Sequence, residues 1–268
     1  MSDGSSKYHI GFGLSDLGPQ PPTLALLCGD PERAYRIATA APEIVLEKKL
    51  SARRGLSSYL LVLPDGRRIL SATSGMGAPS LSIVVNELFA VGIREIIRVG
   101  TCGSLQDDVK VGSVVISRAA LCRQGAADDI APPEYPAAAD PFLTLRLVEA
   151  ARELDIPWHL GVTASVDTFY EGQERTLSSS NPHLLRHLRG INEEYRRLGI
   201  LNYEMEAGTL FKMAGVYGFA AACVCAVLAN RAAGEEVALD LKAQAEADAI
   251  RLALRAAGLP AAYLVDQK

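Results

Sequence analysis

The chain has 268 residues, of which 49% are hydrophobic and 22% are charged, with a formal net charge of -4 at pH 7. This composition is typical of a globular protein and excludes a disordered or fibrous one. The mild acidity argues against a nucleic-acid-binding groove, because neutralising many phosphates requires a basic face.

Neither a membrane span nor a structural metal site is expected. The longest apolar run, residues 219–229, is too short to cross a bilayer, and the polar N-terminal segment lacks an apolar signal core, so we expect a cytoplasmic protein. The five cysteines are odd in number and none forms a C-x-x-C pair, which disfavours a disulfide framework and structural zinc. His183 and His187 lie four residues apart on a helix predicted to begin at Asn181, without an acidic or cysteine partner at a matching offset. We interpret them as part of a solvated helix face.

The first half of the chain is predicted to alternate strands and helices. Its strands are short apolar runs at residues 23–28, 57–63 and 67–73. A Pro-Asp-Gly turn joins the last two as a hairpin. A helix is expected from Pro31, because Asp30 can cap it and proline suits the first helical turn. A glycine loop at residues 74–78 leads into a second helix, which begins at Pro79 and ends at Gly92.

The second half repeats this alternation. Its predicted strands lie at residues 95–99, 113–117, 159–165 and 219–228, and its helices at residues 142–154, 206–217 and 240–257. A loop rich in proline and aspartate is expected at residues 126–140. The alternation indicates an α/β fold with a central mixed β-sheet flanked by helices. No linker-like stretch divides the chain, so residues 1–268 are predicted to form a single domain.

Four predicted strands end in glycine, arginine or a hydroxyl residue, at residues 29–33, 75–77, 98–101 and 230–231. Glycine lets the backbone approach an anion closely, and arginine offers a planar fork of donors that matches phosphate oxygens. In α/β sheets, ligands bind beyond the carboxyl ends of the strands. One such segment alone is better explained as a tight turn with a solvated arginine, but four together favour an oxyanion pocket.

Other phosphate-binding and nucleophile motifs are missing from the sequence. Gly75 and Gly77 lie between a strand and a helix, but Ser80 takes the third glycine position of a dinucleotide fingerprint. The chain contains neither a Gly-Lys-Ser/Thr triplet nor a G-x-S-x-G elbow. The sequence therefore disfavours nicotinamide dinucleotide and nucleoside triphosphate sites.

Two further clusters are typical of a small-molecule pocket. Residues 167–175 place the aromatic ring of Phe169 near the Gln173 amide and the Arg175 guanidinium, a set that can stack a heterocycle and bind its carbonyl–imide edge. Residues 202–206 place two carboxylates around a methionine at a strand-to-helix junction, where a carboxylate can accept from sugar hydroxyls. The second cluster is equally well explained as favourable acidic charge at a helix N-terminus.

These motifs, in this order, resemble the trimeric/hexameric nucleoside phosphorylase family. The resemblance runs from about Tyr8 to the C-terminal helix and rests on five segments, at residues 29–33, 98–101, 167–175, 202–206 and 230–231. The pair of Gln173 and Arg175 is typical of uridine-type members. Purine-type members instead carry an aspartate where this chain has Asn230 and Arg231.

The resemblance implies a nucleoside phosphorylase-like fold and the reversible phosphorolysis of uridine to uracil and ribose 1-phosphate. That reaction is a pentosyl transfer in pyrimidine nucleoside salvage or catabolism, with phosphate as a co-substrate and no cofactor. The resemblance also implies a homo-oligomer, a hexamer built as a trimer of dimers. Residues 1–20 would contribute to its subunit interface.

The resemblance assigns roles to individual positions of this chain. The phosphate-binding positions are Gly29, Arg33, Arg54, Arg98 and Thr101, and the ribose-binding positions are His9, Met205 and Glu206. The base-binding positions are Phe169, Gln173, Arg175, Cys102, Glu204 and Arg231. The expected catalytic residues are Arg98, Glu206, Arg175 and Gln173. His9 and Arg54 would reach the site from a neighbouring subunit, so a monomer would be inactive.

Three positions and one stretch, residues 232–237, depart from the family pattern. Gly55 stands where many bacterial relatives have a glutamate that helps to bind a monovalent cation between subunits, which argues against a potassium site. Cys102 replaces a threonine beside the phosphate and base sites. Ala229 is smaller than the common valine, which predicts a wider base pocket.

Three other functions stay open. A phosphorylase of purine or broader specificity would share the phosphate and ribose sites but not the Gln173/Arg175 pair. A nucleosidase, which uses water, would not need Arg33, Arg54 and Arg98 together. A non-catalytic nucleoside-binding protein would lack at least one phosphate or ribose residue, and none is missing, so we favour phosphorolysis.

Overall fold

The computed structural model describes residues 5–232, 239–260 and 264, and within them nine strands form one sheet. The strands are β1 (Leu24–Cys28), β2 (Val45–Ser51), β3 (Ser58–Val62), β4 (Arg68–Thr73), β5 (Glu95–Ser104), β6 (Val114–Arg123), β7 (Trp158–Val166), β8 (Ile200–Glu204) and β9 (Ala220–Asn230). The helices are α1 (Pro31–Ala38), α2 (Ala78–Ala90), α3 (Gly125–Asp128), α4 (Pro141–Glu153), α5 (Ile191–Arg197), α6 (Ala207–Tyr217) and α7 (Leu239–Ala256).

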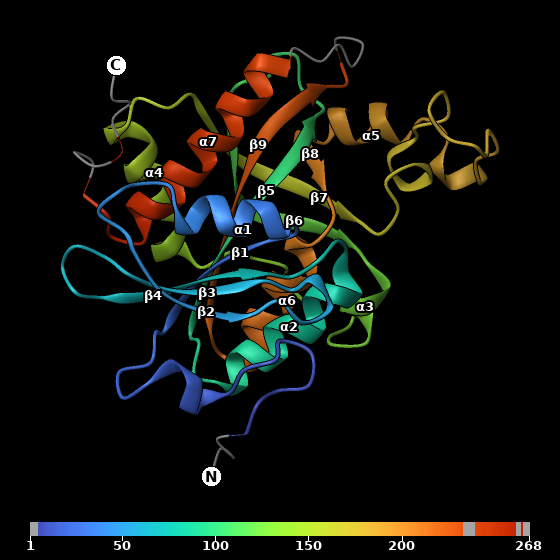
Figure 1. The fold of residues 1–268 in the computed structure, drawn as a ribbon. Helices are drawn as coiled ribbons and strands as arrows, with labels where there is room; N and C mark the ends of the chain where they lie inside the picture. The colour runs from blue at the N-terminus through green and yellow to red at the C-terminus, as the bar shows by residue number, and fades with distance from the viewer. Residues whose placement is uncertain (1–4, 233–238, 261–263, 265–268) are drawn as a thin grey trace.

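The sheet combines an open part and a closed part. Its strand order is β2-β3-β4-β1-β5-β8-β7-β6-β9, and β9 also pairs with β5, so the strands from β5 to β9 close into a ring. Strand β1 runs parallel to β4 and β5, whereas β3 runs antiparallel to both β2 and β4. The open part lies at one end of the molecule and the ring at the other (Figure 1). This mixed sheet with flanking helices confirms the predicted α/β class.

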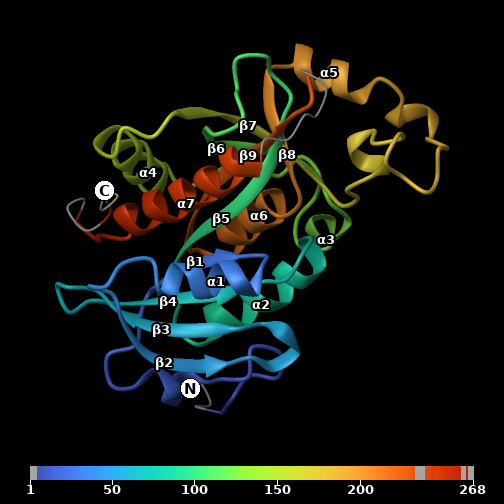
Figure 2. The same cartoon turned by 45° about the horizontal axis from the view of Figure 1, so that its top comes forward.

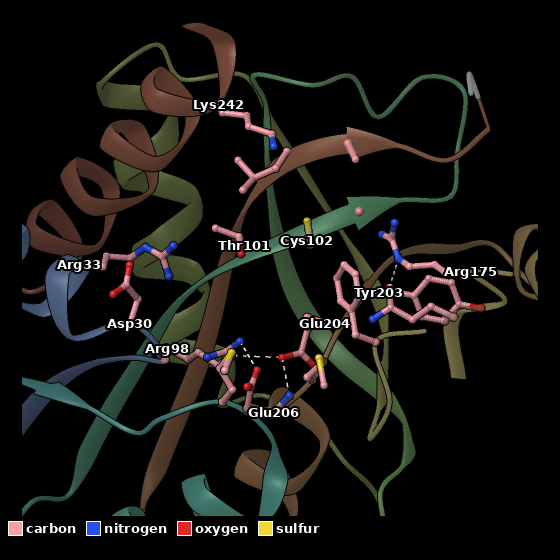
Figure 3. Close-up of a pocket in the computed structure, with 18 of the residues that line it drawn as sticks. Asp30, Arg33, Arg98, Thr101, Cys102, Arg175, Tyr203, Glu204, Glu206 and Lys242 are labelled. Atoms are coloured by element: carbon pink, nitrogen blue, oxygen red, sulfur yellow. Dashed lines mark hydrogen bonds and ion pairs between the residues drawn. The ribbon is translucent and has the colours of Figure 1, made fainter. Parts of the chain in front are cut away.

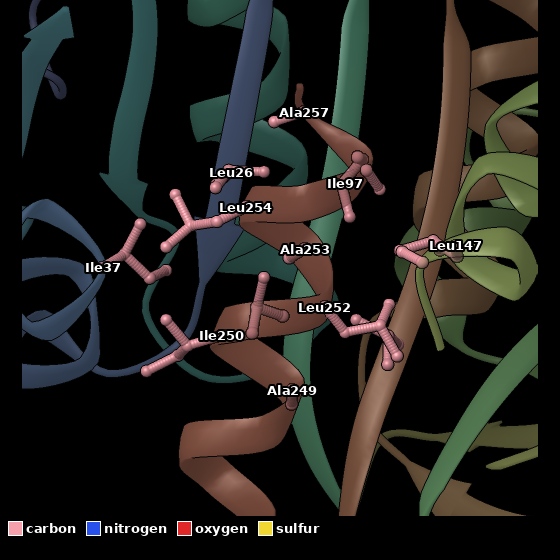
Figure 4. Packing of buried hydrophobic residues seen from close by; sticks show 14 of the residues in the cluster. Leu26, Ile37, Ile97, Leu147, Ala249, Ile250, Leu252, Ala253, Leu254 and Ala257 are labelled. Atoms are coloured by element: carbon pink, nitrogen blue, oxygen red, sulfur yellow. The ribbon is translucent and has the colours of Figure 1, made fainter. Parts of the chain in front are cut away.

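Helices cover both faces of the sheet, and each face has its own core. Consecutive residues of a strand point to opposite faces, so Leu26 and Leu27 of β1 enter different hydrophobic clusters. The first cluster packs α1, α4 and α7 against the sheet, and Figure 4 shows Ile250 and Leu254 of α7 facing α1 and β1. The second cluster packs α2 and α6 against the other face. In the described part of the chain, no helix is long and apolar enough to span a membrane.

The predicted helix that begins at Asn181 is wrong. The Asn181 side chain accepts a hydrogen bond from the backbone amide of His183, a local turn that competes with the helix start. Only one short 3₁₀ turn follows, at Arg186–Leu188. His183 and His187 are exposed, so their side chains are solvated as predicted, on a loop segment that extends away from the sheet (Figure 2).

Four of the helices and strands have no counterpart in the sequence prediction: β2, α5, most of β8, and α3, which overlaps the loop expected at residues 126–140. Strand β2 is the edge strand of the sheet, and most of its residues are exposed, so it carries charged residues instead of an apolar pattern. Strand β8 is short and includes the buried polar residues Asn202 and Glu204, of which Glu204 lines the site described below. Strands β2 and β8 are missed because the exposure of a strand depends on its position in the sheet, which the local pattern of hydrophobic residues does not indicate.

Candidate active site

A cavity of about 600 Å³ lies where β1, β5, β8 and β9 end. Its lining brings together most of the predicted site residues, namely Gly29, Arg33, Arg98, Thr101, Cys102, Phe169, Gln173, Arg175, Glu204, Met205 and Glu206 (Figure 3). Ala229, the position predicted to widen the base pocket, also lines it. The cavity therefore joins side chains from segments that are far apart in the sequence.

Arg98 of β5 lies at the floor of the cavity between two carboxylates. Its Nε donates to Glu204 Oε2 at 3.1 Å, and its Nη2 donates to Glu206 Oε2. Glu206 Oε1 also accepts the backbone amide of Gly77 at 2.6 Å. Arg98 is only 4% exposed, and its Nη1 has no hydrogen-bond partner among the described residues. A buried guanidinium with a free donor is suited to binding an oxyanion in the cavity.

Glu204 holds the start of α6 and thereby positions Glu206. Its Oε2 accepts the backbone amides of Glu206 and Ala207, both at 2.8 Å, and its Oε1 accepts from the Ser165 hydroxyl. Burial raises the pKa of Glu204 to about 7, and the charge of Glu206 adds to the rise, while Arg98 opposes it. Glu204 is thus a carboxyl whose charge depends on pH near neutrality.

This raised pKa predicts a pH-dependent contribution to stability. The pKa of Glu204 is raised from 4.5 to about 7, so the folded protein keeps this proton to higher pH than the unfolded chain does. The resulting stabilisation is complete below the unfolded pKa and is lost as the pH rises through the folded pKa. Relative to the non-ionising variant Glu204→Gln, the wild type should lose unfolding free energy from about pH 5 to about pH 8. Urea denaturation at several pH values measures this difference, and a constant difference would contradict the assignment.

The second buried guanidinium, Arg33 of α1, lies at the wall of the same cavity. Asp30 caps α1 by accepting the Glu32 amide at 2.9 Å, as predicted, and this places Arg33 in the first turn. Arg33 Nη2 lies 3.4 Å from Glu246 Oε1, whereas its buried Nε has no hydrogen-bond partner in the described residues. At Gly29, an added Cβ would lie 3.1 Å from the carbonyl oxygen of Gly75, so a side chain there would crowd the glycine loop that precedes α2.

The opposite end of the cavity holds an aromatic ring, an amide and a guanidinium as one unit. The Arg175 guanidinium lies over the Phe169 ring, 4.3 Å from its centroid, and Arg175 Nε donates to Gln173 Oε1 at 3.3 Å. Arg231 does not line the cavity; it donates to the backbone carbonyl of Gln173 and lies over the Tyr203 ring. This end can stack a planar ring and hydrogen-bond to its polar edge.

Cys102 supplies a neutral wall between the two ends. The side chain is buried, and burial raises the pKa of its thiol well above the ordinary value, with the hydrogen bond to Cys225 acting in the same direction. A protonated thiol is a poor metal ligand or nucleophile, so Cys102 contributes shape to the cavity rather than charge.

His9 and Arg54 lie outside the cavity of their own chain. His9 Nδ1 lies 2.7 Å from Glu87 Oε1, and Arg54 Nη2 donates to the Tyr8 hydroxyl at 3.2 Å. Of the three arginines predicted to converge on one anion, this chain therefore brings together Arg33 and Arg98. A contribution of His9 and Arg54 to a neighbouring subunit stays a prediction.

Several lining residues are not predicted from the sequence, namely Pro31, Met76, Gly103, Tyr203, Leu228 and Lys242, and Asp30 is predicted only as a helix cap. Most of them are neighbours of predicted residues within the same motifs. Lys242 is different, because it belongs to α7, where the sequence shows only helical periodicity. No pattern in the chain connects it to the strand ends.

Comparison with known proteins identifies the family of the chain. Residues 23–264 match the Phosphorylase superfamily. The chain is 39% identical over 253 residues to a uridine phosphorylase of Escherichia coli strain K12, covering 94% of this chain and 97% of that one. It is 37% identical over 232 residues to a uridine phosphorylase of Thermococcus kodakarensis, covering 85% and 79% of the two chains.

A phosphorylase named for another nucleoside is also similar to this chain. A guanosine phosphorylase of Halorubrum lacusprofundi is 31% identical over 217 residues, covering 81% of this chain and 82% of that one. The superfamily match spans all nine strands of the described sheet and every segment that lines the cavity. This chain is a member of the Phosphorylase superfamily.

Proposed function

We propose that the protein is a uridine phosphorylase, a pentosyltransferase that converts uridine and phosphate to uracil and ribose 1-phosphate, reversibly. The observation that carries this proposal is one cavity with two buried guanidiniums, Arg33 and Arg98, at one end and the Gln173/Arg175 pair at the other. The uridine phosphorylases of Escherichia coli and Thermococcus kodakarensis support it by their similarity. Phosphate acts as a co-substrate, and we propose no resident cofactor.

The reaction exchanges one bond at C1′ of the ribose for another. A phosphate oxygen, held by Arg33, Arg98 and Thr101, forms the new bond to C1′ while the bond from C1′ to the uracil nitrogen breaks. Glu206 accepts from the ribose hydroxyls and stabilises the positive charge that develops on the sugar. The electron pair leaves with uracil. The negative charge on the leaving base is bound by hydrogen bonds from Gln173 and Arg175, so positioning and charge stabilisation supply the catalysis.

The deciding experiment measures uracil release from uridine in the presence and absence of inorganic phosphate. Release that requires phosphate, with ribose 1-phosphate as the second product, supports the proposal. Release at the same rate without phosphate would identify a nucleosidase instead. Guanosine in the same assay tests the broader specificity that the Halorubrum lacusprofundi relative and the small side chain of Ala229 make worth measuring.

Removing the guanidinium at the base end should impair turnover. Arg175 is stacked on Phe169 and bonded to Gln173, aimed at the charge that develops on uracil. We expect Arg175→Ala to lower kcat for uridine phosphorolysis on the order of 10²–10³-fold, the usual loss for a donor directed at developing charge. The matched control is Arg186→Ala, an exposed arginine of the nearby 3₁₀ turn, which should turn over normally. Near-normal turnover by Arg175→Ala would remove this residue from the mechanism.

We further propose that the enzyme is a homohexamer, a trimer of dimers, that serves pyrimidine nucleoside salvage in the cytoplasm. The position of His9 and Arg54 outside the cavity of their own chain supports sites that are shared between subunits. Residues 5–20 of the predicted interface segment lie within the described structure, whereas residues 1–4 lie outside it. Gly55 in place of a carboxylate argues against a potassium site at the interface.

A further inference from the structure

Lys242 is a cation of the cavity that the proposed mechanism does not use. It lies in the first turns of α7, is partly exposed, and lines the cavity together with Asp30, Arg33 and Thr101. Figure 3 shows Lys242 reaching from α7 across the top of the cavity, above Thr101. Its ammonium therefore lies at the mouth of the cavity rather than at the floor, where Arg98 lies.

The ammonium of Lys242 is not neutralised by Glu246, the acidic residue four positions further along α7. Glu246 lies one helical turn further along α7, on the same face. Its carboxylate is engaged by α1 instead, because Arg36 Nη1 lies 2.7 Å and Arg33 Nη2 lies 3.4 Å from its oxygens. Among the residues that the structure describes, no carboxylate lies within 4.0 Å of Lys242 Nζ. The ion pairs also show that this face of α7 lies beside Arg33.

The charges in the half of the cavity that holds Arg33 and Arg98 indicate a role for Lys242. Besides Arg33 and Arg98, its lining carries the carboxylates of Asp30, Glu204 and Glu206. Glu204 is partly protonated near neutral pH, and Arg54 of the partner subunit is proposed to add one cation, so this half carries little net charge without Lys242. The ammonium of Lys242 adds a positive charge that attracts a phosphate ion, and a low-dielectric cavity wall strengthens this attraction.

We propose that Lys242 recruits inorganic phosphate, binding the ion at the cavity mouth and contributing to its affinity once it reaches Arg33 and Arg98. This inference rests on the proposed function, in which phosphate is a substrate. Lys242 acts by its charge and by one hydrogen bond to the anion, so its effect is directed to phosphate and not to uridine.

The test is the dissociation constant of inorganic phosphate for the full-length protein, measured by isothermal titration calorimetry at low ionic strength. Lys242→Met should bind phosphate about 5- to 10-fold more weakly, because it loses a charge-assisted hydrogen bond at a partly exposed position. Lys242→Arg should bind with nearly the wild-type affinity. The matched control is Arg118→Met, which removes one exposed cation of β6 outside the cavity and should leave phosphate binding unchanged. Added salt should reduce the difference in phosphate dissociation constant between wild type and Lys242→Met, because salt screens the charge of the ammonium.

Kinetics give an independent measurement on the same variants. In Lys242→Met, the KM for phosphate should rise by the same factor, whereas the KM for uridine should stay within about twofold of wild type, because Lys242 acts on the anion alone. Equal phosphate dissociation constants for wild type and Lys242→Met would overturn the proposal. The calorimetric result does not require turnover, so it separates this inference from the proposed function: phosphate-independent uracil release would refute the function without changing the dissociation constants.

Discussion

Replacing Glu206 by glutamine should lower kcat/KM for uridine phosphorolysis by about 10³-fold, because the charge that faces the developing positive ribose is removed. Glu206 is buried, 4% exposed, and fixed by the Gly77 amide and by Arg98. A glutamine can keep the hydrogen bond to Gly77 through its oxygen. Its amide nitrogen would then face the Arg98 guanidinium, donor against donor, and the negative charge would be lost.

Steady-state kinetics with saturating phosphate measure this loss. The matched control is Glu149→Gln, an exposed carboxylate of α4 far from the cavity, which should behave as wild type. The Glu206→Gln protein should still fold, because Arg98 keeps Glu204 as a partner, and its thermal unfolding checks this. A kcat/KM within tenfold of wild type would show that the carboxylate charge is not part of catalysis.

Replacing Arg98 by methionine should damage both turnover and stability. The guanidinium is buried between Glu204 and Glu206, so its removal leaves two carboxylates close together without a cation. Breaking a buried ion pair by removing one partner costs about 3–5 kcal/mol of unfolding free energy. Phosphorolysis should fall by more than about 10³-fold, because the phosphate also loses a buried donor.

Urea denaturation and phosphorolysis rates measure the two effects separately. Arg255→Met is the matched control for stability, because Arg255 pairs with Glu153 at the partly exposed surface, where such pairs contribute only about 0–1 kcal/mol. If Arg98→Met does not fold, Arg98→Lys keeps the charge and should retain most of the stability while turnover still falls, since an ammonium cannot bridge both carboxylates and the phosphate. If Arg98→Met has the unfolding free energy of the wild type, the ion pairs of Arg98 with Glu204 and Glu206 do not stabilise the fold.

Much of the fold follows from patterns that are local in the chain. Strands β1, β3, β4 and β9 are apolar runs bounded by turn residues, and the predicted ranges agree with the structure to within a few residues. The glycine and arginine segments after β1 and in β5 identify part of the cavity lining, because these strands run parallel and bring their carboxyl ends to one edge of the sheet. The acidic segment after β8 also lines the cavity, but β8 runs antiparallel to β5, so this rule does not predict its place. The edge strand β2 is not predicted from the sequence, because most of its residues are exposed and it lacks the apolar pattern of a buried strand.

The sequence by itself determined the α/β class, the residue types of the site and their distribution over strand ends, because burial and backbone conformation leave local patterns. Only the tertiary structure decided which charges meet. Arg98 contacts Glu204 and Glu206, which are 106 and 108 residues away, and Lys242 reaches the same cavity from a helix without any motif. Such contacts depend on the strand order, in which β5 lies between β1 and β8 and also pairs with β9. Hydrophobic periodicity reports whether a residue is buried, but it carries no information about the partner that shares its buried environment.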